Sequence, residues 1–224
     1  MVVSAVDHPV DFHALVDQGI NKPARYMGHE LGVVPRDWDQ ACVRWALTYP
    51  EIYEVGSSNL GHIILYSILN AVPGQLCDRA YLPAPDLAER LRERKQPLFA
   101  VESRRPLLAF DVLGFSLSYE LGATNILEML DLCQVPIRAA DRADLPLNDP
   151  DSVPLIFAGG PTATSNPEPY SPFFDFIALG DGEELPMSFV ESKRVLLTSM
   201  VTILKSSSRI PWPLSKGDSS ITAI

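Results

Sequence analysis

Glycines follow two short apolar runs in a pattern that suits a ligand-binding edge. Continuous apolar runs bounded by turn residues are typical of buried parallel strands. A glycine beyond the carboxyl end of such a strand lets the backbone approach a ligand closely. Tight turns alone would also explain the glycines, so both interpretations stay open. The runs and the residues that follow them are 155–158 with Gly159, Gly160 and Pro161, and 176–179 with Gly180, Gly182 and Glu183.

Hydroxyl and amide side chains dominate three loops that we expect at the same edge, residues 56–61, 116–119 with Thr124 and Asn125, and 159–166. Ionisable groups are scarce in these loops, which favours holding a polar cofactor over acid–base catalysis, and we predict no catalytic residue. The loops match neither a dinucleotide fingerprint nor a phosphate-binding loop, and there is no G-x-S-x-G nucleophile motif. The polar side chains are Ser57, Ser58, Asn59, Ser116, Ser118, Thr162, Thr164 and Asn166.

No metal site is predicted from the ionisable residues. His62 lies next to the predicted edge and could ligate a metal or bind a ligand, but a half-exposed helical histidine is the simpler interpretation. Acidic residues at 181, 183 and 184 could bind a cation, or could interact with the backbone amides of the next element. Cys42, Cys77 and Cys133 form no C-x-x-C pair, so no zinc motif is visible.

The elements that must position these residues alternate between strands and helices. Such alternation predicts parallel pairing with right-handed crossovers. We therefore predict an α/β fold with a doubly wound, mostly parallel sheet of about five strands. An irregular leader (1–40) precedes this α/β domain (41–185), and the tail that follows (186–224) is predicted to be unrelated to the domain and disordered. The predicted strands are 43–47, 79–82, 112–117, 155–158 and 176–179, and the predicted helices begin near 60, 87 and 123.

Charge and composition exclude several classes of partner. The net charge of −10 argues against nucleic acid and against an anionic membrane surface. Three dispersed cysteines and the lack of a signal-peptide pattern at the amino terminus fit a cytoplasmic protein. The acidity is uneven, because 13 Lys/Arg and 26 Asp/Glu precede residue 186, whereas 5 and 2 follow. The tail's one long apolar run, 195–204, is interrupted by hydroxyl residues and is too short to cross a bilayer.

Several blocks of sequence, in order, resemble the amino-terminal region of cobalamin-binding-type radical S-adenosylmethionine proteins, over about residues 22–185. The blocks are KPARYMGHE, RWALTYPEIYEVGSSNLGHIILYSILN, AYLPAPDLAERLRERKQPLFAVESRRPLLAFDVLGFSLSYELGATNILEMLDL, FAGGPTATSNPEP and FFDFIALGDGEE. The resemblance implies a cobalamin-binding domain of flavodoxin-like topology. It also implies a cobalamin-facing edge that comprises Gly56, Ser57, Ser58, Asn59, Gly61, Ser116, Tyr119, Gly159, Gly160, Pro161, Gly180, Gly182 and Glu183.

The chain departs from that family's pattern in two respects. It lacks the D-x-H-x-x-G motif through which many cobalamin domains supply a histidine ligand. It also lacks the C-x-x-x-C-x-x-C motif that holds a [4Fe–4S] cluster in the barrel that follows in the family. We therefore expect weak cobalamin binding at most. The cluster, S-adenosylmethionine and the family's reaction are expected only with a radical S-adenosylmethionine barrel, supplied by a full-length parent or by another chain.

Two other functions remain open at this stage. The chain could be a non-catalytic α/β module that has lost the cofactor and only docks a barrel or another protein. A flavin- or nucleotide-binding domain is the third possibility, although no phosphate-loop signature supports it.

Overall fold

The computed structural model describes residues 8–17, 19–28, 30, 33, 36–142, 153–180 and 182. Among the sequence predictions, Glu183 and the tail from 186 to 224 lie outside these residues. None of the described helices is long and apolar enough to cross a membrane.

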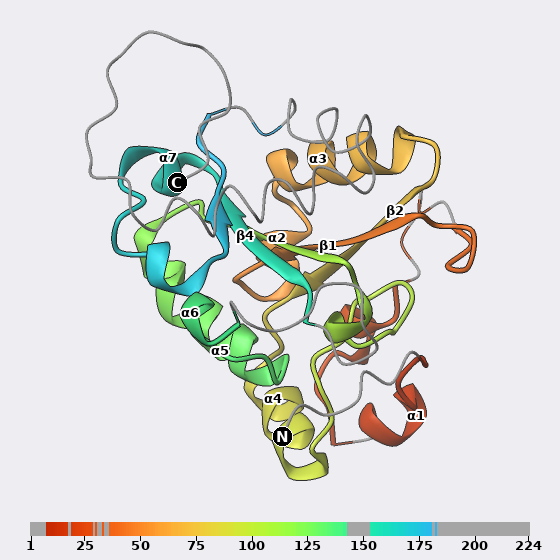
Figure 1. Cartoon of the computed structure of the whole chain (residues 1–224). Helices are drawn as coiled ribbons and strands as arrows, with labels where there is room; N and C mark the ends of the chain where they lie inside the picture. The colour runs from red at the N-terminus through yellow and green to blue at the C-terminus, as the bar shows by residue number, and fades with distance from the viewer. Residues whose placement is uncertain are drawn as a thin grey trace, which may run out of the picture.

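Five parallel strands form one sheet, in the order β2-β1-β3-β4-β5 (Figure 1). This order is one of the two common orders of doubly wound sheets. The predicted fold class, an α/β fold with a five-stranded parallel sheet, is thus confirmed. The strands are β1 (Val43–Tyr49), β2 (Gln75–Tyr81), β3 (Val112–Ser116), β4 (Leu155–Gly159) and β5 (Phe176–Ile177).

Strand β2 begins four residues earlier than the sequence predicts. Its first half contains Gln75 and Asp78, so the residues do not form an apolar run. Both side chains are nevertheless buried. Neighbouring side chains and loops cover this edge strand, and the Asp78 carboxylate accepts hydrogen bonds from the backbone amides of Glu102 and Ser103.

Helices cover both faces of the sheet. On one face, α4 (Pro85–Arg94) and α5 (Ala123–Leu132) enclose the larger core, whereas α3 (Leu60–Ala71) packs on the other (Figure 1). Short helices complete the connections. They are α1 (Phe12–Leu15), α2 (Tyr53–Gly56), α6 (Ala139–Arg142) and α7 (Pro161–Ser165), with 3-10 helices at Pro23–Tyr26, Leu107–Ala109, Glu120–Gly122 and Ser171–Phe173.

The leader contributes to the same core as the sheet. Phe12, Leu15, Tyr26 and Trp38 are buried in the larger core together with residues of α4 and β3. The hydroxyl of Tyr26 accepts a hydrogen bond from the backbone of Ala84 at 3.1 Å, where α4 begins. The leader is therefore packed against the α/β domain through these residues.

Candidate functional site

A pocket of about 410 Å³ opens at the carboxyl end of the central strands. Strands β1 and β3 are neighbours, but the chain leaves β1 towards α3 and leaves β3 towards α5, on the opposite face. Divergence of this kind creates a crevice at the edge of the sheet, which is the usual binding position in doubly wound folds. The pocket lies on the α3 side of the sheet.

Eight of the predicted site residues line this pocket. They come from the loop before α3, the end of β3, the β4–α7 turn and the segment after β5. The eight residues are Asn59, Gly61, Ser116, Gly159, Gly160, Pro161, Gly180 and Gly182. Tertiary structure thus brings together residues that lie more than 100 positions apart in the chain.

Four other predicted site residues do not line the pocket and instead shape the neighbouring loops. A Cβ atom on Gly56 would lie 2.4 Å from the ring of Tyr81, so this glycine allows close packing. Ser58 donates a hydrogen bond to the carbonyl of Val55 at 2.9 Å. The hydroxyl of Tyr119 is bonded to Glu51. The fourth residue, Ser57, closes the last turn of α2 through its backbone amide.

Asn59 caps α3 by accepting a hydrogen bond from the backbone amide of His62 at 3.0 Å, whereas neither Ser57 nor Ser58 serves as the cap. The Asn59 amide also donates to the hydroxyl of Tyr49 at 3.2 Å. These two bonds hold Asn59 at the mouth of the pocket.

The apolar floor of the pocket was not predicted from the sequence. One row across the sheet places Leu47 beside Gly114 and Gly114 beside Phe157. A Cβ atom on Gly114 would lie 2.7 Å from the Phe157 ring, so the glycine makes room for that ring. Phe157 stacks on Phe176 with ring centroids 5.0 Å apart. A glycine inside an apolar strand was the signal available in the sequence.

His62 is buried, which corrects the interpretation that it is half-exposed. Only 1% of the residue is exposed, and its ring lies 5.7 Å, between centroids, from each of Tyr49 and Tyr81. Burial, with a smaller contribution from Arg79, lowers the pKa of His62 to about 3. The imidazole is therefore neutral near pH 7, and neither ring nitrogen has a hydrogen-bond partner among the described residues.

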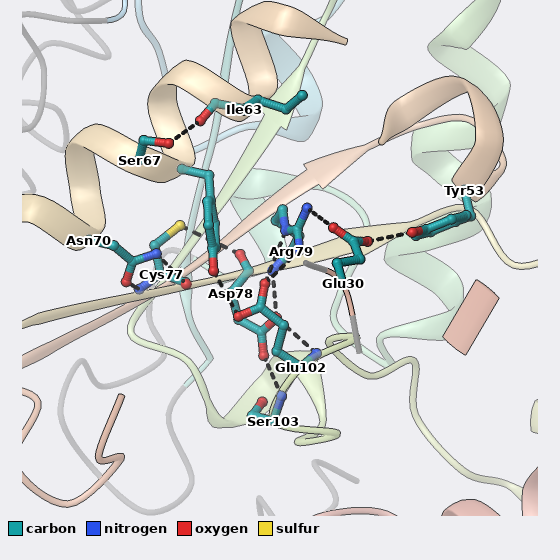
Figure 2. Close-up of polar contacts among 11 residues, drawn as sticks. Glu30, Tyr53, Ile63, Ser67, Asn70, Cys77, Asp78, Arg79, Glu102 and Ser103 are labelled. Atoms are coloured by element: carbon teal, nitrogen blue, oxygen red, sulfur yellow. Dashed lines mark hydrogen bonds and ion pairs between the residues drawn. The ribbon is translucent and has the colours of Figure 1, made fainter. Parts of the chain in front are cut away.

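A second pocket, of about 350 Å³, lies at the outer edge of β2 beside a cluster of charged residues. Figure 2 shows Arg79 between two carboxylates, 2.7 Å from Glu30 and 2.8 Å from Glu102. Only 5% of the Arg79 side chain is exposed, and its guanidinium lies over the ring of Tyr66. Glu102 is mostly buried and pairs with Arg79.

The charged cluster joins two segments to the edge strand β2, namely the leader at Glu30 and the loop at residues 102–103. Asp78 accepts hydrogen bonds from the backbone amides of Glu102 at 3.1 Å and Ser103 at 2.8 Å. At the preceding residue of β2, the Asn70 side chain bonds both backbone groups of Cys77. These contacts satisfy polar groups that an edge strand would otherwise leave unpaired. In the part of the chain that the structure describes, no group of three His, Cys, Asp or Glu residues could hold a metal ion.

Removal of the Glu102 carboxylate is expected to change how stability depends on pH. Burial and the neighbouring Asp78 raise the pKa of Glu102 to about 7. A raised carboxyl pKa means that the folded state keeps a proton that the unfolded state loses. Stability from this group is therefore present below the unfolded pKa of 4.5 and is lost as the pH rises through about 7.

Urea unfolding of the protein and of Glu102→Gln tests this prediction. Between about pH 5 and about pH 8, the unmodified protein should lose roughly 2 kcal/mol more stability than the variant. His62 acts in the opposite sense because its lowered pKa favours the unfolded state in acid, but it is common to both proteins and cancels in the comparison. Equal losses in the two proteins would contradict the assigned environment of Glu102.

Comparison with known proteins identifies the family. The family described as "Radical SAM proteins, N-terminal" matches residues 61–210, which is 150 of the 224 residues. The match begins in α3, includes all strands from β2 to β5, and continues beyond the described residues. No curated protein and no solved structure gave a match. With two thirds of its length covered by this family, the chain belongs to the radical S-adenosylmethionine (SAM) proteins and carries their N-terminal domain.

Proposed function

We propose that this chain is the cofactor-holding domain of a radical SAM protein and that its 410 Å³ pocket binds part of a cobalamin. The observation that carries the proposal is the pocket itself, which lies where doubly wound sheets bind ligands. No charged side chain lines it among the described residues. Its lining combines glycines and the polar residues Asn59, His62, Ser116 and Ser118 with the apolar residues Trp45, Leu47 and Phe157.

The size and the lining of the pocket limit what can enter it. Its volume lies in the range of about 300–1,000 Å³ that is usual for small-molecule sites. A flat, neutral ring such as the base of the cobalamin nucleotide fits an apolar floor of this size. The corrin macrocycle is larger and would remain at the glycine-rich rim, with its outer face uncovered by this domain. Because enclosure supplies much of the affinity of a ligand site, we expect weak binding.

Bound cobalamin would supply methyl transfer or assistance to radical chemistry. The protein's own contribution is to bind and orient the cofactor, since Ser116 and Asn59 offer neutral hydrogen-bonding groups and the floor excludes water. The three cysteines of the sequence are far apart, so we expect no iron–sulfur cluster to be held by this chain.

A titration with hydroxocobalamin, followed by visible absorbance, tests the proposal. We expect a saturable spectral change with the unmodified protein. Gly159→Val should weaken the affinity for hydroxocobalamin at least tenfold, or by about 1.4 kcal/mol. Gly159 lines the pocket, and a Cβ atom there would make only ordinary contacts, 3.7 Å from Ala178, so we expect the valine side chain to occupy part of the pocket volume.

Ser57→Ala is the matched control for this titration, because Ser57 was predicted in the site but does not line the pocket. It should bind as the unmodified protein does. The lack of any spectral change with the unmodified protein, or equal binding by Gly159→Val, would contradict the proposal. An iron assay after anaerobic reconstitution should detect no stoichiometric iron.

A docking module is the second candidate function, and exposed apolar residues at the same edge favour it. Val55, in α2, is 44% exposed, and Leu121, before α5, is 82% exposed. Both lie in connections that follow strands β1 and β3, so a radical SAM barrel on another chain could cover them. A lack of cobalamin binding, combined with barrel binding that Leu121→Asp abolishes, would support this function instead.

A further inference from the structure

Helix α3 exposes a row of apolar side chains that the described structure does not cover. Leu60 is 69% exposed, Ile63 and Ile64 are each 37% exposed, and Ile68 is half-buried. These four residues, hereafter the α3 outer face, lie opposite the side on which Leu65 and Leu69 pack on the sheet. A helix that is apolar on all sides is normally buried on all sides. Figure 1 shows α3 as the outermost labelled helix on its face of the sheet.

The chain leaves the described structure beside this helix. A Cβ atom on Gly182, the last described residue, would lie 3.2 Å from a methyl carbon of Leu65. Twelve residues separate Gly182 from the apolar run 195–204. An extended segment of that length reaches roughly 40 Å, more than twice the ~18 Å length of a twelve-residue helix. The run can therefore reach any part of the α3 outer face.

Two further observations favour this part of the same chain as the cover. The family match starts in α3 and continues to residue 210, so α3 and the run belong to one family domain. The charges are also complementary, because residues 1–185 carry a net charge of −13 and residues 186–224 carry +3. Composition alone favours an irregular tail, but it takes no account of an apolar surface that needs a cover.

We propose that residues 195–204 pack on the α3 outer face and complete the second layer of the domain. The run offers seven apolar residues in ten, and three hydroxyl residues interrupt them. It therefore has apolar side chains to bury against the helix and a few polar ones to leave in water. This inference does not depend on which ligand the pocket binds.

Hydrogen exchange of the full chain, followed by mass spectrometry, tests the proposal. We expect amides in 195–204 to exchange at least about tenfold more slowly than in an unstructured peptide. The double variant Leu60→Asp/Ile64→Asp should abolish this protection, because it places two charges on the face that the run covers. Leu121→Asp is the matched control, since it makes the same kind of change at an exposed residue outside α3, and it should leave the protection intact.

Unchanged protection of β1 and β3 in the double variant shows that the domain remains folded. Exchange of 195–204 at the unstructured rate in the unmodified protein would overturn the proposal. Protection that survives the double variant would also overturn it. The proposal would also be overturned if dilution removed both the protection and a dimer detected by its mass. In that case a second copy of the chain would cover the α3 outer face.

Discussion

Replacing Arg79 with methionine is expected to lower the free energy of unfolding by about 3–5 kcal/mol near pH 8, the cost of breaking a buried ion pair. The guanidinium bonds Glu30 and Glu102, and methionine would leave both carboxylates without a cation. Asp78 lies next to the pair and is buried, which adds a third acidic group. The loss should be smaller near pH 5, where Glu102, with a pKa of about 7, is protonated.

Arg92→Met is the matched control for this experiment. Arg92 also pairs with a glutamate, at 3.0 Å from Glu128, but 49% of its side chain is exposed. Exposed ion pairs contribute at most about 1 kcal/mol, so this variant should stay within that limit. Urea unfolding of the two variants checks the prediction. If Arg79→Met lowers the free energy of unfolding as little as Arg92→Met does, the Arg79 cluster is more hydrated than the structure indicates.

Replacing Gly160 with valine is expected to destabilise the protein by roughly 3 kcal/mol or more and to distort the pocket edge. The φ angle of Gly160 is +115° and its ψ angle is 177°, a backbone conformation that is almost confined to glycine. A Cβ atom would lie 2.7 Å from the carbonyl oxygen of Leu117. That oxygen is backbone and accepts a hydrogen bond from Thr162, so it cannot move aside cheaply.

Variants at two neighbouring glycines distinguish backbone strain from steric clash as the cause of the lost stability. Gly180→Ala introduces strain alone, because its φ angle is +98° but no atom lies within 4 Å of a Cβ atom there, and it should cost about 1–3 kcal/mol. Gly159→Ala has neither positive φ nor a clash, so it should change stability by less than about 1 kcal/mol. Thermal or urea unfolding measures all three. A Gly160→Val loss no larger than that of Gly159→Ala would contradict the described turn.

The sheet could be predicted from local pattern wherever a strand is buried on both faces. Residues 155–158 and 176–179 are continuous apolar runs, residues 112–117 are apolar apart from Gly114 and Ser116, and each segment overlaps a strand of the observed sheet. The pattern fails at the start of β2. There Asp78 is buried only because backbone amides of residues 102 and 103, far along the chain, bind its carboxylate.

The candidate site was predictable only in part, for a related reason. Glycines after strands mark a sheet edge, and most of those predicted, such as Gly159 and Gly182, line the pocket. Their spacing in the sequence does not reveal which of them face the same side of the sheet. Gly56 illustrates the difference, because its missing side chain serves the packing of Tyr81 and not the pocket.

Local sequence pattern therefore predicts the fold class and the edge of the sheet at which the pocket opens. These follow from hydrophobic runs and turn residues, which act over a few neighbouring positions. Tertiary structure alone decided which residues form the pocket floor, why His62 is neutral and buried, and how Arg79 is paired. Each of these depends on strand register and on contacts between distant segments, because a side chain's environment is set by the groups packed around it and not by its neighbours along the chain.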